Sequence, residues 1–421
     1  MHTSPKVLVV GTTSDYIDWI RRSCPERALF LTDPLIRQQA KEPKPAPHEE
    51  ILCDLADYER ALEALKNHLR SWQLSLSGIT SYDCESMELV AILAHDLSLE
   101  YPSVEAIGNC RNKYLSKVLW YQCGISCPSG RLVRSSEDAV SFFKQINGTC
   151  VLKPVTGSGS ELLLCCNTAD ECRRGFSTIL KGLMQRQANR LYRSFSTDHP
   201  SILVEERVEG EEFSCDFTIE NERVEVIRLS RKILDKKGPF GTIRGYALPA
   251  SLPSGINPKD FLKTLHQGAK ALGMSRAICM LDFLVRENEL VLLEMAPRPG
   301  GDCLPFLLLR QYNVDILKLN LDFAQHRPIQ FPEPNNNHPA IGLRVHARGN
   351  GILKKIDATA LLQDPRILEI HLPRVPGHVI RIPPEDYDSW LLGHIIFRPV
   401  QETNVETQCT EIIGQITVEI E

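Results

Sequence analysis

Two acids, Asp282 and Glu294, stand in adjacent apolar runs of the chain, CMLD and VLLE. A carboxylate is costly to bury unless a cation or several hydrogen bonds replace its hydration. Mg²⁺ takes carboxylate oxygens as ligands and keeps other positions for water and phosphate. The two acids therefore predict a magnesium site. The alternative is that each acid pairs with a lysine or arginine, and Arg298 stands close enough in sequence to be such a partner.

An arginine follows the second acid in LLEMAPRPGG, where Arg298 stands between Pro297 and Pro299. Because proline fixes its own φ, the two prolines stiffen the turn that presents this arginine. A guanidinium binds carboxylate and phosphate oxygens through two parallel hydrogen bonds. Gly300 and Gly301 then let the chain leave a crowded site. The turn predicts a guanidinium held close to the two acids.

A lysine in front of a Gly/Ser loop is a further candidate site. In VLKPVTGSGS, Lys153 ends an expected strand, and small residues follow at Gly157, Ser158, Gly159 and Ser160. Small residues let backbone N–H groups approach phosphate oxygens, and the lysine supplies a countercharge. The spacing is not that of a P-loop. Taken alone, the segment is equally well read as an ordinary Gly/Ser hairpin.

Acidic residues also cluster in VEERVEGEEF. Glu205 and Glu206 end an expected strand, and Gly210 separates them from Glu212. In isolation this segment is best read as a solvated acidic turn. On an apolar cleft, its backbone groups suit an adenine edge and its carboxylate suits ribose hydroxyls, since ligand sites combine apolar walls with a few polar groups.

Alternating strands and helices must position these groups. The segments KVLVVG and ALFLTD read as strands, and YERALEALKNHLR and SMELVAILAHDLSLE read as helices. This alternation predicts an open, mostly parallel sheet in the N-terminal part. The turn at Gly11 lacks the further glycines of a dinucleotide-binding fingerprint. Later, AICMLDFLVRENELVLLEM predicts a hairpin turning at 287–289, and FPEPNNNHPA reads as a linker before a strand-rich end.

Composition limits the function classes. The net charge is -5 and the pI about 6.2, so no electrostatic footprint for nucleic acid is present. No apolar run is long enough to span a bilayer, and the N-terminal residues do not resemble a signal peptide. The 14 cysteines form no C-x-x-C pair, so we expect buried thiols in a reducing compartment, hence a cytoplasmic protein, and no zinc site.

The candidate segments, taken in order along the chain, resemble the ATP-grasp superfamily of carboxylate–amine ligases, including L-amino-acid ligases and carbamoyl-phosphate-synthase-like enzymes. A lysine opens the helix in NKYLSKVLWYQCGISCPSG, a stretch similar to the family's segment of a lysine, a glycine and a proline. The resemblance covers nearly the whole chain. It implies an α/β ATP-grasp fold with an α+β lid. The expected parts are a Rossmann-like pre-ATP-grasp domain at 1–108, the ATP-grasp domain at 109–334 with its lid at about 128–204, and a strand-rich C-terminal subdomain at 335–421.

The resemblance also implies a role for each candidate residue. Lys113 and Lys153 would contact the ATP phosphates, and residues 156–160 would close over them. The residues expected to meet the nucleoside are Glu205, Glu206, Val208 and Glu212. Asp282 and Glu294 would hold Mg²⁺ or Mn²⁺, and Arg298 would stabilise an acyl-phosphate and its tetrahedral successor. Many members carry an asparagine where this chain has Ala296, which leaves the number of metal ions open.

The implied reaction joins a small carboxylate to an amine through an acyl-phosphate, with release of ADP and phosphate. The segment GLRVHARGNGILKKID is similar to the C-terminal subdomain of amino-acid ligases, which favours an amino acid as the carboxylate. Arginine binds carboxylates at two points, so Arg231, Arg244 and Arg344 are candidates to hold the substrate, although a structural or surface role is the commoner one for an arginine.

Two alternatives remain open at this stage. One is phosphorylation of bicarbonate or formate, as in carboxylases and purine-pathway enzymes. The other is ATP binding without catalysis, for which Ala296 is the main support. The expected partners are small-molecule substrates rather than nucleic acid or membrane, and a homodimer is a family expectation.

Overall fold

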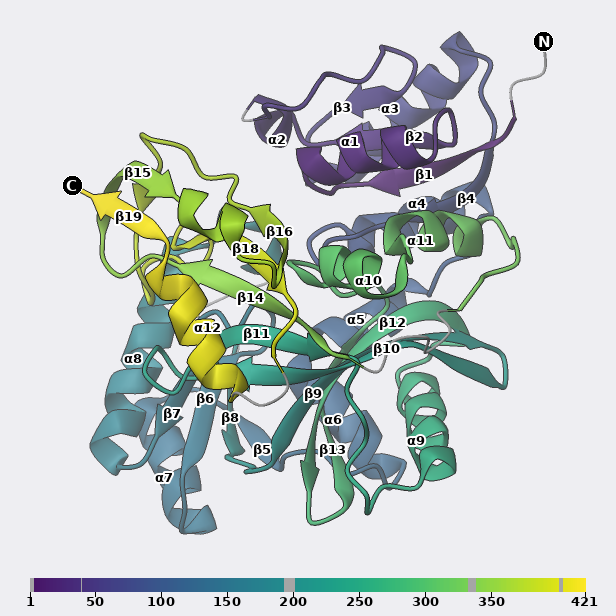
Figure 1. The fold of residues 1–421 in the computed structure, drawn as a ribbon. Coiled ribbons are helices and arrows are strands. Elements are labelled where there is room, and N and C mark those ends of the chain that lie inside the picture. The colour runs from purple at the N-terminus through teal and green to yellow at the C-terminus, as the bar shows by residue number, and fades with distance from the viewer. Residues whose placement is uncertain (1–3, 39, 193–200, 332–337, 401–403) are drawn as a thin grey trace.

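The computed structural model describes residues 4–38, 40–192, 201–331, 338–400 and 404–421. These residues form a four-stranded sheet near the N-terminus, a second four-stranded sheet, one eight-stranded sheet and one three-stranded sheet. In Figure 1 the N-terminal sheet lies at the top, the second four-stranded sheet at the lower left, and the large sheet between them. No helix in the described part is long and apolar enough to cross a membrane.

The N-terminal sheet has the order β3-β2-β1-β4, and all its strands are parallel. Its strands are β1 (Lys6–Val10), β2 (Ala28–Thr32), β3 (Glu50–Leu52) and β4 (Leu76–Thr80). The helices between and after them are α1 (Ser14–Ser23), α2 (Pro34–Gln38), α3 (Tyr58–Ser71), α4 (Met87–Leu97) and α5 (Val104–Arg111). Both faces of β1 are buried because helices cover them, as parallel sheets require. The parallel sheet expected from the alternating pattern is confirmed.

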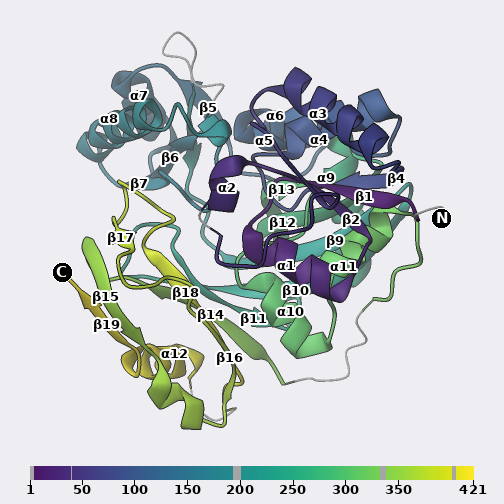
Figure 2. The same ribbon diagram turned by 90° about the horizontal axis from the view of Figure 1, so that it is seen from above.

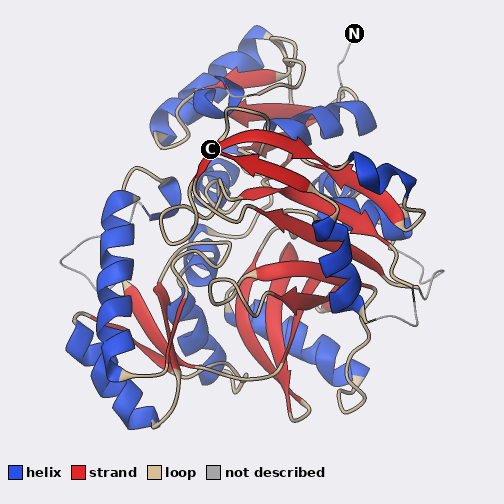
Figure 3. Ribbon diagram, turned by 60° about the vertical axis from the view of Figure 1, so that its left-hand side comes forward, coloured by secondary structure: helices blue, strands red, loops and turns tan. Residues whose placement is uncertain are grey.

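A separate antiparallel unit follows, which we call the lid (residues 130–206). Its sheet has the order β5-β8-β6-β7, and two helices, α7 and α8, pack on it. Its strands are β5 (Gly130–Val133), β6 (Cys150–Pro154), β7 (Leu164–Cys166) and β8 (Ile202–Glu206). Its helices are α7 (Ser136–Ile146), α8 (Ala169–Gln185) and the short η1 (Arg190–Tyr192). Figure 3 shows this sheet and its helices as a group apart from the large sheet.

The eight-stranded sheet carries the expected hairpin at one edge. Its order is β13-β12-β9-β10-β11-β14-β18-β16. The strands are β9 (Glu211–Glu220), β10 (Arg223–Leu234), β11 (Ile243–Leu248), β12 (Arg276–Arg286), β13 (Glu289–Ala296), β14 (Ala340–His346), β16 (Ile367–His371) and β18 (Leu391–Phe397). Strands from the C-terminal part thus continue the same sheet across position 335. The domain limits drawn from the sequence stay predictions.

Helices and a small sheet complete the fold (Figures 1 and 2). The helices are α6 (Lys113–Gln122), α9 (Pro258–Ala271), α10 (Leu304–Tyr312), α11 (Ile316–Ala324), η2 (Thr359–Gln363) and α12 (Val405–Gly414). The small sheet, β17-β15-β19, consists of β15 (Gly351–Asp357), β17 (Val379–Ile380) and β19 (Thr417–Ile420). Most of the linker expected at 331–340 lies outside the described residues.

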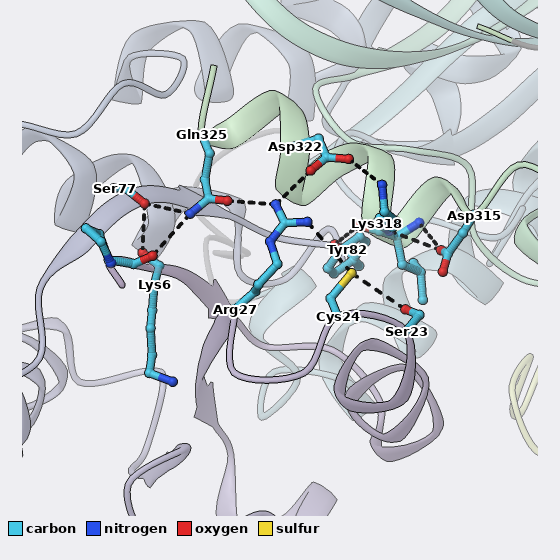
Figure 4. A network of polar contacts seen from close by, with 12 residues as sticks. Lys6, Ser23, Cys24, Arg27, Ser77, Tyr82, Asp315, Lys318, Asp322 and Gln325 are labelled. Atoms are coloured by element: carbon cyan, nitrogen blue, oxygen red, sulfur yellow. Dashed lines mark hydrogen bonds and ion pairs between the residues drawn. The ribbon is translucent and has the colours of Figure 1, made fainter. Parts of the chain in front are cut away.

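The N-terminal sheet docks on α11 through a polar network (Figure 4). Arg27 donates to Asp322 and to Gln325, each at 2.7 Å. Gln325 in turn donates to the Ser77 hydroxyl at 2.7 Å. The Tyr82 hydroxyl donates to the Leu317 carbonyl at 2.8 Å. These contacts join the N-terminal sheet to a helix some 300 residues later in the chain.

The lid core contains a thiol cluster that the sequence did not predict. Cys150 on β6, Cys166 on β7 and Cys172 on α8 are buried, and their sulfurs lie within 4.8 Å of one another. The sequence showed no C-x-x-C pair, and the fold brings these three thiols together from different elements of the lid. Burial raises the pKa of the Cys172 thiol to about 12, as expected for a neutral thiol packed in an apolar core. All cysteines of the described chain are free.

Candidate active site

A cavity of about 260 Å³ gathers many of the predicted residues. It lies where the Gly/Ser loop of the lid, the start of α4, helix α6 and strands β11 to β14 of the large sheet meet. The predicted residues that line it are Lys113, Gly157, Ser158, Gly159, Ser160, Asp282, Glu294, Arg298 and Arg344. Ala296 also lines it, so the position without a side-chain ligand faces the same space. We call it the catalytic cavity.

The two acids lie side by side at this cavity. Asp282 on β12 pairs in register with Glu294 on β13. Opposite residues of an antiparallel pair have their side chains on the same face of the sheet. Each acid also has a lysine nearby: Lys232 lies 2.7 Å from Asp282, and Lys113 lies 3.5 Å from Glu294. The lysine pairing that the sequence left open is thus present, but with these lysines rather than with Arg298.

The acids still suit a divalent cation. Oδ1 of Asp282 is buried and has no hydrogen-bond partner among the described residues. Burial alone would raise the pKa of Glu294, but Lys113 and Lys232 hold it below its usual range, so the carboxylate is charged at neutral pH. An unsatisfied carboxylate oxygen beside a second charged carboxylate fits Mg²⁺. Asp282 and Glu294 are therefore the residues that would hold it.

The predicted Lys153 and Glu205 form a buried ion pair beside the cavity. Lys117, which the sequence analysis did not single out, lies 3.4 Å from the other oxygen of Glu205. Its ammonium also donates to the Leu293 carbonyl at 3.0 Å. Burial lowers the pKa of Lys117 to about 8, whereas Lys117 and Lys153 hold the pKa of Glu205 below its usual range despite its burial. Two lysines therefore share one carboxylate next to the phosphate-binding candidates.

Helix α6 aims Lys113 and Lys117 in the same direction, because residues four apart share a helix face. The helix begins at Asn112, whose side chain accepts hydrogen bonds from the Tyr114 and Leu115 amides. Lys113 directly follows this cap and donates to the Gly157 carbonyl at 2.8 Å. Asparagine is among the preferred N-cap residues. The cap thus fixes the lysine that joins α6 to the Gly/Ser loop.

A buried ion pair anchors the turn that carries Arg298. Arg228 and Asp216 are almost completely buried and 2.7 Å apart, and Asp216 accepts the Gly300 amide at 3.0 Å. A Cβ on Gly300 would meet the Arg228 guanidinium at 2.4 Å, so only glycine fits here. The Asp216–Gly300 contact fixes the backbone two residues after Arg298. This function of the glycine differs from the exit path expected from the sequence.

Arg298 lines the cavity without a carboxylate partner. Its Nε donates to the Cys84 sulfur at 3.0 Å, and its Nη1 donates to the Pro299 carbonyl at 2.7 Å. No carboxylate of the described residues forms an ion pair with it. Although burial lowers the pKa of this guanidinium, Cys84, Glu85 and Asp83 raise it above its usual range. Both carboxylates lie beyond ion-pair distance, so this half-buried cation still favours an anionic ligand. This guanidinium is therefore available to an anion inside the catalytic cavity.

The three substrate-binding candidates lie in different places. Arg344 on β14 lines the cavity and lies 2.8 Å from Asp302, which also lines it. Arg231 points elsewhere, is 40% exposed and lies 3.7 Å from Glu211. Arg244 donates to the Thr410 hydroxyl on α12 at 2.9 Å. Of the three, Arg344 alone is among the residues that line the catalytic cavity.

The residues predicted to contact the nucleoside of ATP lie where β8 ends and where β9 begins. Glu205 is buried, while Glu206 is half-buried and accepts the Ser129 amide at 2.9 Å. Glu212 lies 3.7 Å from Lys232, the same lysine that meets Asp282. Val208 lies in the short connection between the two strands. None of these residues lines the catalytic cavity, and their nucleotide roles stay predictions.

Four site residues escaped the sequence analysis: Lys117, Asp216, Arg228 and Lys232. Lys117 could have been identified from its spacing, because it lies four residues after Lys113 and so on the same face of the expected helix. For Lys232, Asp216 and Arg228, the signal was a charged residue inside an apolar strand, the same signal that identified Asp282. The ion-pair partners of these residues could not be predicted from the sequence, because each pair joins residues on different strands.

Known proteins are similar to this chain in sequence and in fold. The family model described as "ATP-grasp domain" matches residues 146–305. The D-alanine–D-alanine ligase of Acidovorax ebreus is 24% identical over 207 residues, 47% of this chain and 57% of that enzyme. Carnosine synthase 1 of Homo sapiens is 25% identical over 289 residues, 63% of this chain and 33% of that enzyme. The chain thus spans between a third and just over half of the length of these relatives.

Solved structures match over the full length. An L-amino acid ligase from Bacillus licheniformis has a TM-score of 0.77, with 17% identity and coverage of 100% of both chains. Biotin carboxylases and N5-carboxyaminoimidazole ribonucleotide synthetases share the fold at TM-scores of 0.63 to 0.69. At such identities the likeness concerns the fold alone.

Proposed function

We propose, from the match of residues 146–305 to an ATP-grasp domain and from the likeness in fold to ATP-grasp enzymes, that this chain forms an amide bond between a small carboxylate and an amine. The carboxylate would be an amino acid. ATP would first phosphorylate it, giving an acyl-phosphate and ADP, and the amine would then displace phosphate. The observation that carries the proposal is Arg298, a half-buried guanidinium that forms no ion pair with a described carboxylate, at a cavity that also holds an acid pair.

In this mechanism the chain's own residues bind and neutralise charge. Lys113, the Gly/Ser loop and Lys153 would hold the phosphates, since phosphoryl transfer depends on positioning and charge neutralisation. Arg298 would stabilise the negative charge on the transferred group. Mg²⁺ held by Asp282 and Glu294 would supply further charge neutralisation. Arg344 would hold the carboxylate substrate, because it lines the same cavity and presents a planar guanidinium.

Two observations support an amino acid as the carboxylate substrate. Two of the similar proteins are a D-alanine–D-alanine ligase and an L-amino acid ligase. The C-terminal strands also continue the catalytic sheet, so that Arg344 on β14 reaches the cavity. Phosphorylation of bicarbonate, or nucleotide binding without turnover, are the outcomes that would replace this proposal.

The test measures ADP release with Mg²⁺ and ATP under three conditions: a pool of amino acids, bicarbonate, and no acceptor. We expect release with the amino acids only. Arg298→Ala should abolish that release while nucleotide binding, measured by calorimetry, persists. Arg231→Ala is the matched control, because Arg231 is exposed and lies outside the cavity. Release with bicarbonate alone, or undiminished turnover of Arg298→Ala, would contradict the proposal.

A further inference from the structure

A second cavity, of about 310 Å³, adjoins the catalytic cavity. It lies between α3, the start of α4, α5 and the end of the lid. The charged residues that line it are Glu85, Glu88, Arg111 and Arg190. Arg111 lines the catalytic cavity as well, so the two spaces adjoin at this residue.

Residues 83–88 border both cavities. Cys84 and Met87 line the catalytic cavity, whereas Glu85 and Glu88 line the second one. The turn is held in place by Asp83, which accepts the Thr12 amide at 2.8 Å and the Ser86 amide at 2.7 Å. These hydrogen bonds hold the backbone at Glu85. Glu85 directly follows Cys84, whose sulfur contacts Arg298.

Two opposite charges in the second cavity lack ion-pair partners. Glu88 and Arg111 are 3.3 Å apart and satisfy each other. Glu85, by contrast, forms no ion pair with any described residue. Arg190 donates to the Ser86 hydroxyl at 3.3 Å and meets no carboxylate among the described residues. Burial raises the pKa of Glu85, with Asp83 adding to the shift and Arg190 and Arg298 opposing it.

A cavity with one carboxylate and one guanidinium that form no ion pair with any described residue matches a zwitterion. We infer that the second cavity binds the amine substrate as an α-amino acid, with Glu85 receiving its ammonium group and Arg190 its carboxylate. This inference rests on the proposed ligase function and names the acceptor class for it. Each charge of the ligand then meets an opposite charge, so that neither is buried unpaired.

The same placement assigns Glu85 a part in the second step. Where the two cavities adjoin, the ammonium group passes one proton to the Glu85 carboxylate, and the nitrogen lone pair forms the bond to the acyl carbon. The bond from that carbon to the phosphate oxygen then breaks. The leaving phosphate carries away the second proton, which leaves a neutral amide and inorganic phosphate.

The experiment separates the two steps with hydroxylamine, a small nucleophile that traps acyl-phosphates as hydroxamates and needs neither Glu85 nor Arg190. Wild type with ATP and amino acids should form hydroxamate. Glu85→Gln and Arg190→Gln should keep this activity, which also reports that the variants fold. For the amino-acid acceptor both should raise KM by about 10- to 100-fold, the worth of a hydrogen bond to a charged group. Glu85→Gln should in addition lower kcat.

Matched controls remove a like charge from a nearby exposed site: Glu105→Gln on α5 and Arg174→Gln on α8. An amine acceptor that lacks a carboxylate should bind wild type and Arg190→Gln equally. The inference is overturned if the Glu85 and Arg190 variants change KM no more than the controls. It is also overturned if they lose hydroxamate formation together with amide formation. Absence of hydroxamate in wild type would instead overturn the proposed function itself.

Discussion

At the scale of single residues, Lys117 decides the charge beside the phosphate-binding candidates. It is fully buried between Glu205 and the Leu293 carbonyl, and burial lowers its pKa to about 8. Above about pH 8 the native protein therefore loses a positive charge that an unfolded lysine keeps up to about pH 10.4. The unfolded chain then binds more protons, so this group makes the free energy of unfolding rise with pH across that window.

We expect the opposite trend for nucleotide binding, because an anionic ligand prefers the protonated lysine. The affinity for ADP should fall as pH rises from 7 to 9, measured by calorimetry. Lys117→Gln, which mimics the uncharged form, should bind weakly at both values and show little pH dependence. Equal affinity of wild type at pH 7 and 9 would contradict the role of Lys117.

At the scale of elements, two helix caps of similar chemistry have different expected effects. Asn112 caps α6 next to Lys113, whereas Ser135 caps α7 through a capping box on the lid. Removing an N-cap side chain costs about 1 kcal/mol of stability in either case. Only the first cap lies beside the catalytic cavity.

Asn112→Ala and Ser135→Ala should therefore lose about the same stability in urea, roughly 1 kcal/mol each. Asn112→Ala alone should weaken nucleotide binding, because the first turn of α6, which begins with Lys113, loses its N-cap. Asn112→Ser keeps a capping oxygen and should retain most of both properties. If Ser135→Ala weakens nucleotide binding as much as Asn112→Ala does, the loss comes from general destabilisation and not from the position of Lys113.

At the scale of the whole molecule, Arg27 joins the first strands to α11. It and Asp322 are largely buried, with exposed side-chain fractions of 18% and 13%. Arg27→Met should lower the free energy of unfolding by about 2 kcal/mol, since hydrogen bonds to charged groups are lost on a partly buried surface. Arg22→Met, which removes an exposed pair with Asp18, is the control and should change it little. Equal losses, measured by chemical denaturation, would contradict this docking role.

The sequence predicted the parts of the molecule that depend on local pattern. The hairpin turn at 287–289 set the register that places Asp282 opposite Glu294. Strand and helix alternation likewise predicted the parallel N-terminal sheet. Lys232 could not be assigned to Asp282, because β9 lies between their strands and local periodicity does not give strand order. The second cavity was also beyond reach, since its walls come from helices and the lid that meet only in the folded chain.

One short stretch links the two cavities. Arg111, Asn112 and Lys113 are consecutive: the first lines both cavities, the second caps α6, and the third contacts the Gly/Ser loop. A nucleotide that orders Lys113 would therefore also order Arg111. The kinetic consequence is a compulsory order of substrate addition, with nucleotide before acceptor. Initial-rate patterns should then show ADP competing with ATP but not with the amine, and a random order would show that the stretch does not couple the two cavities.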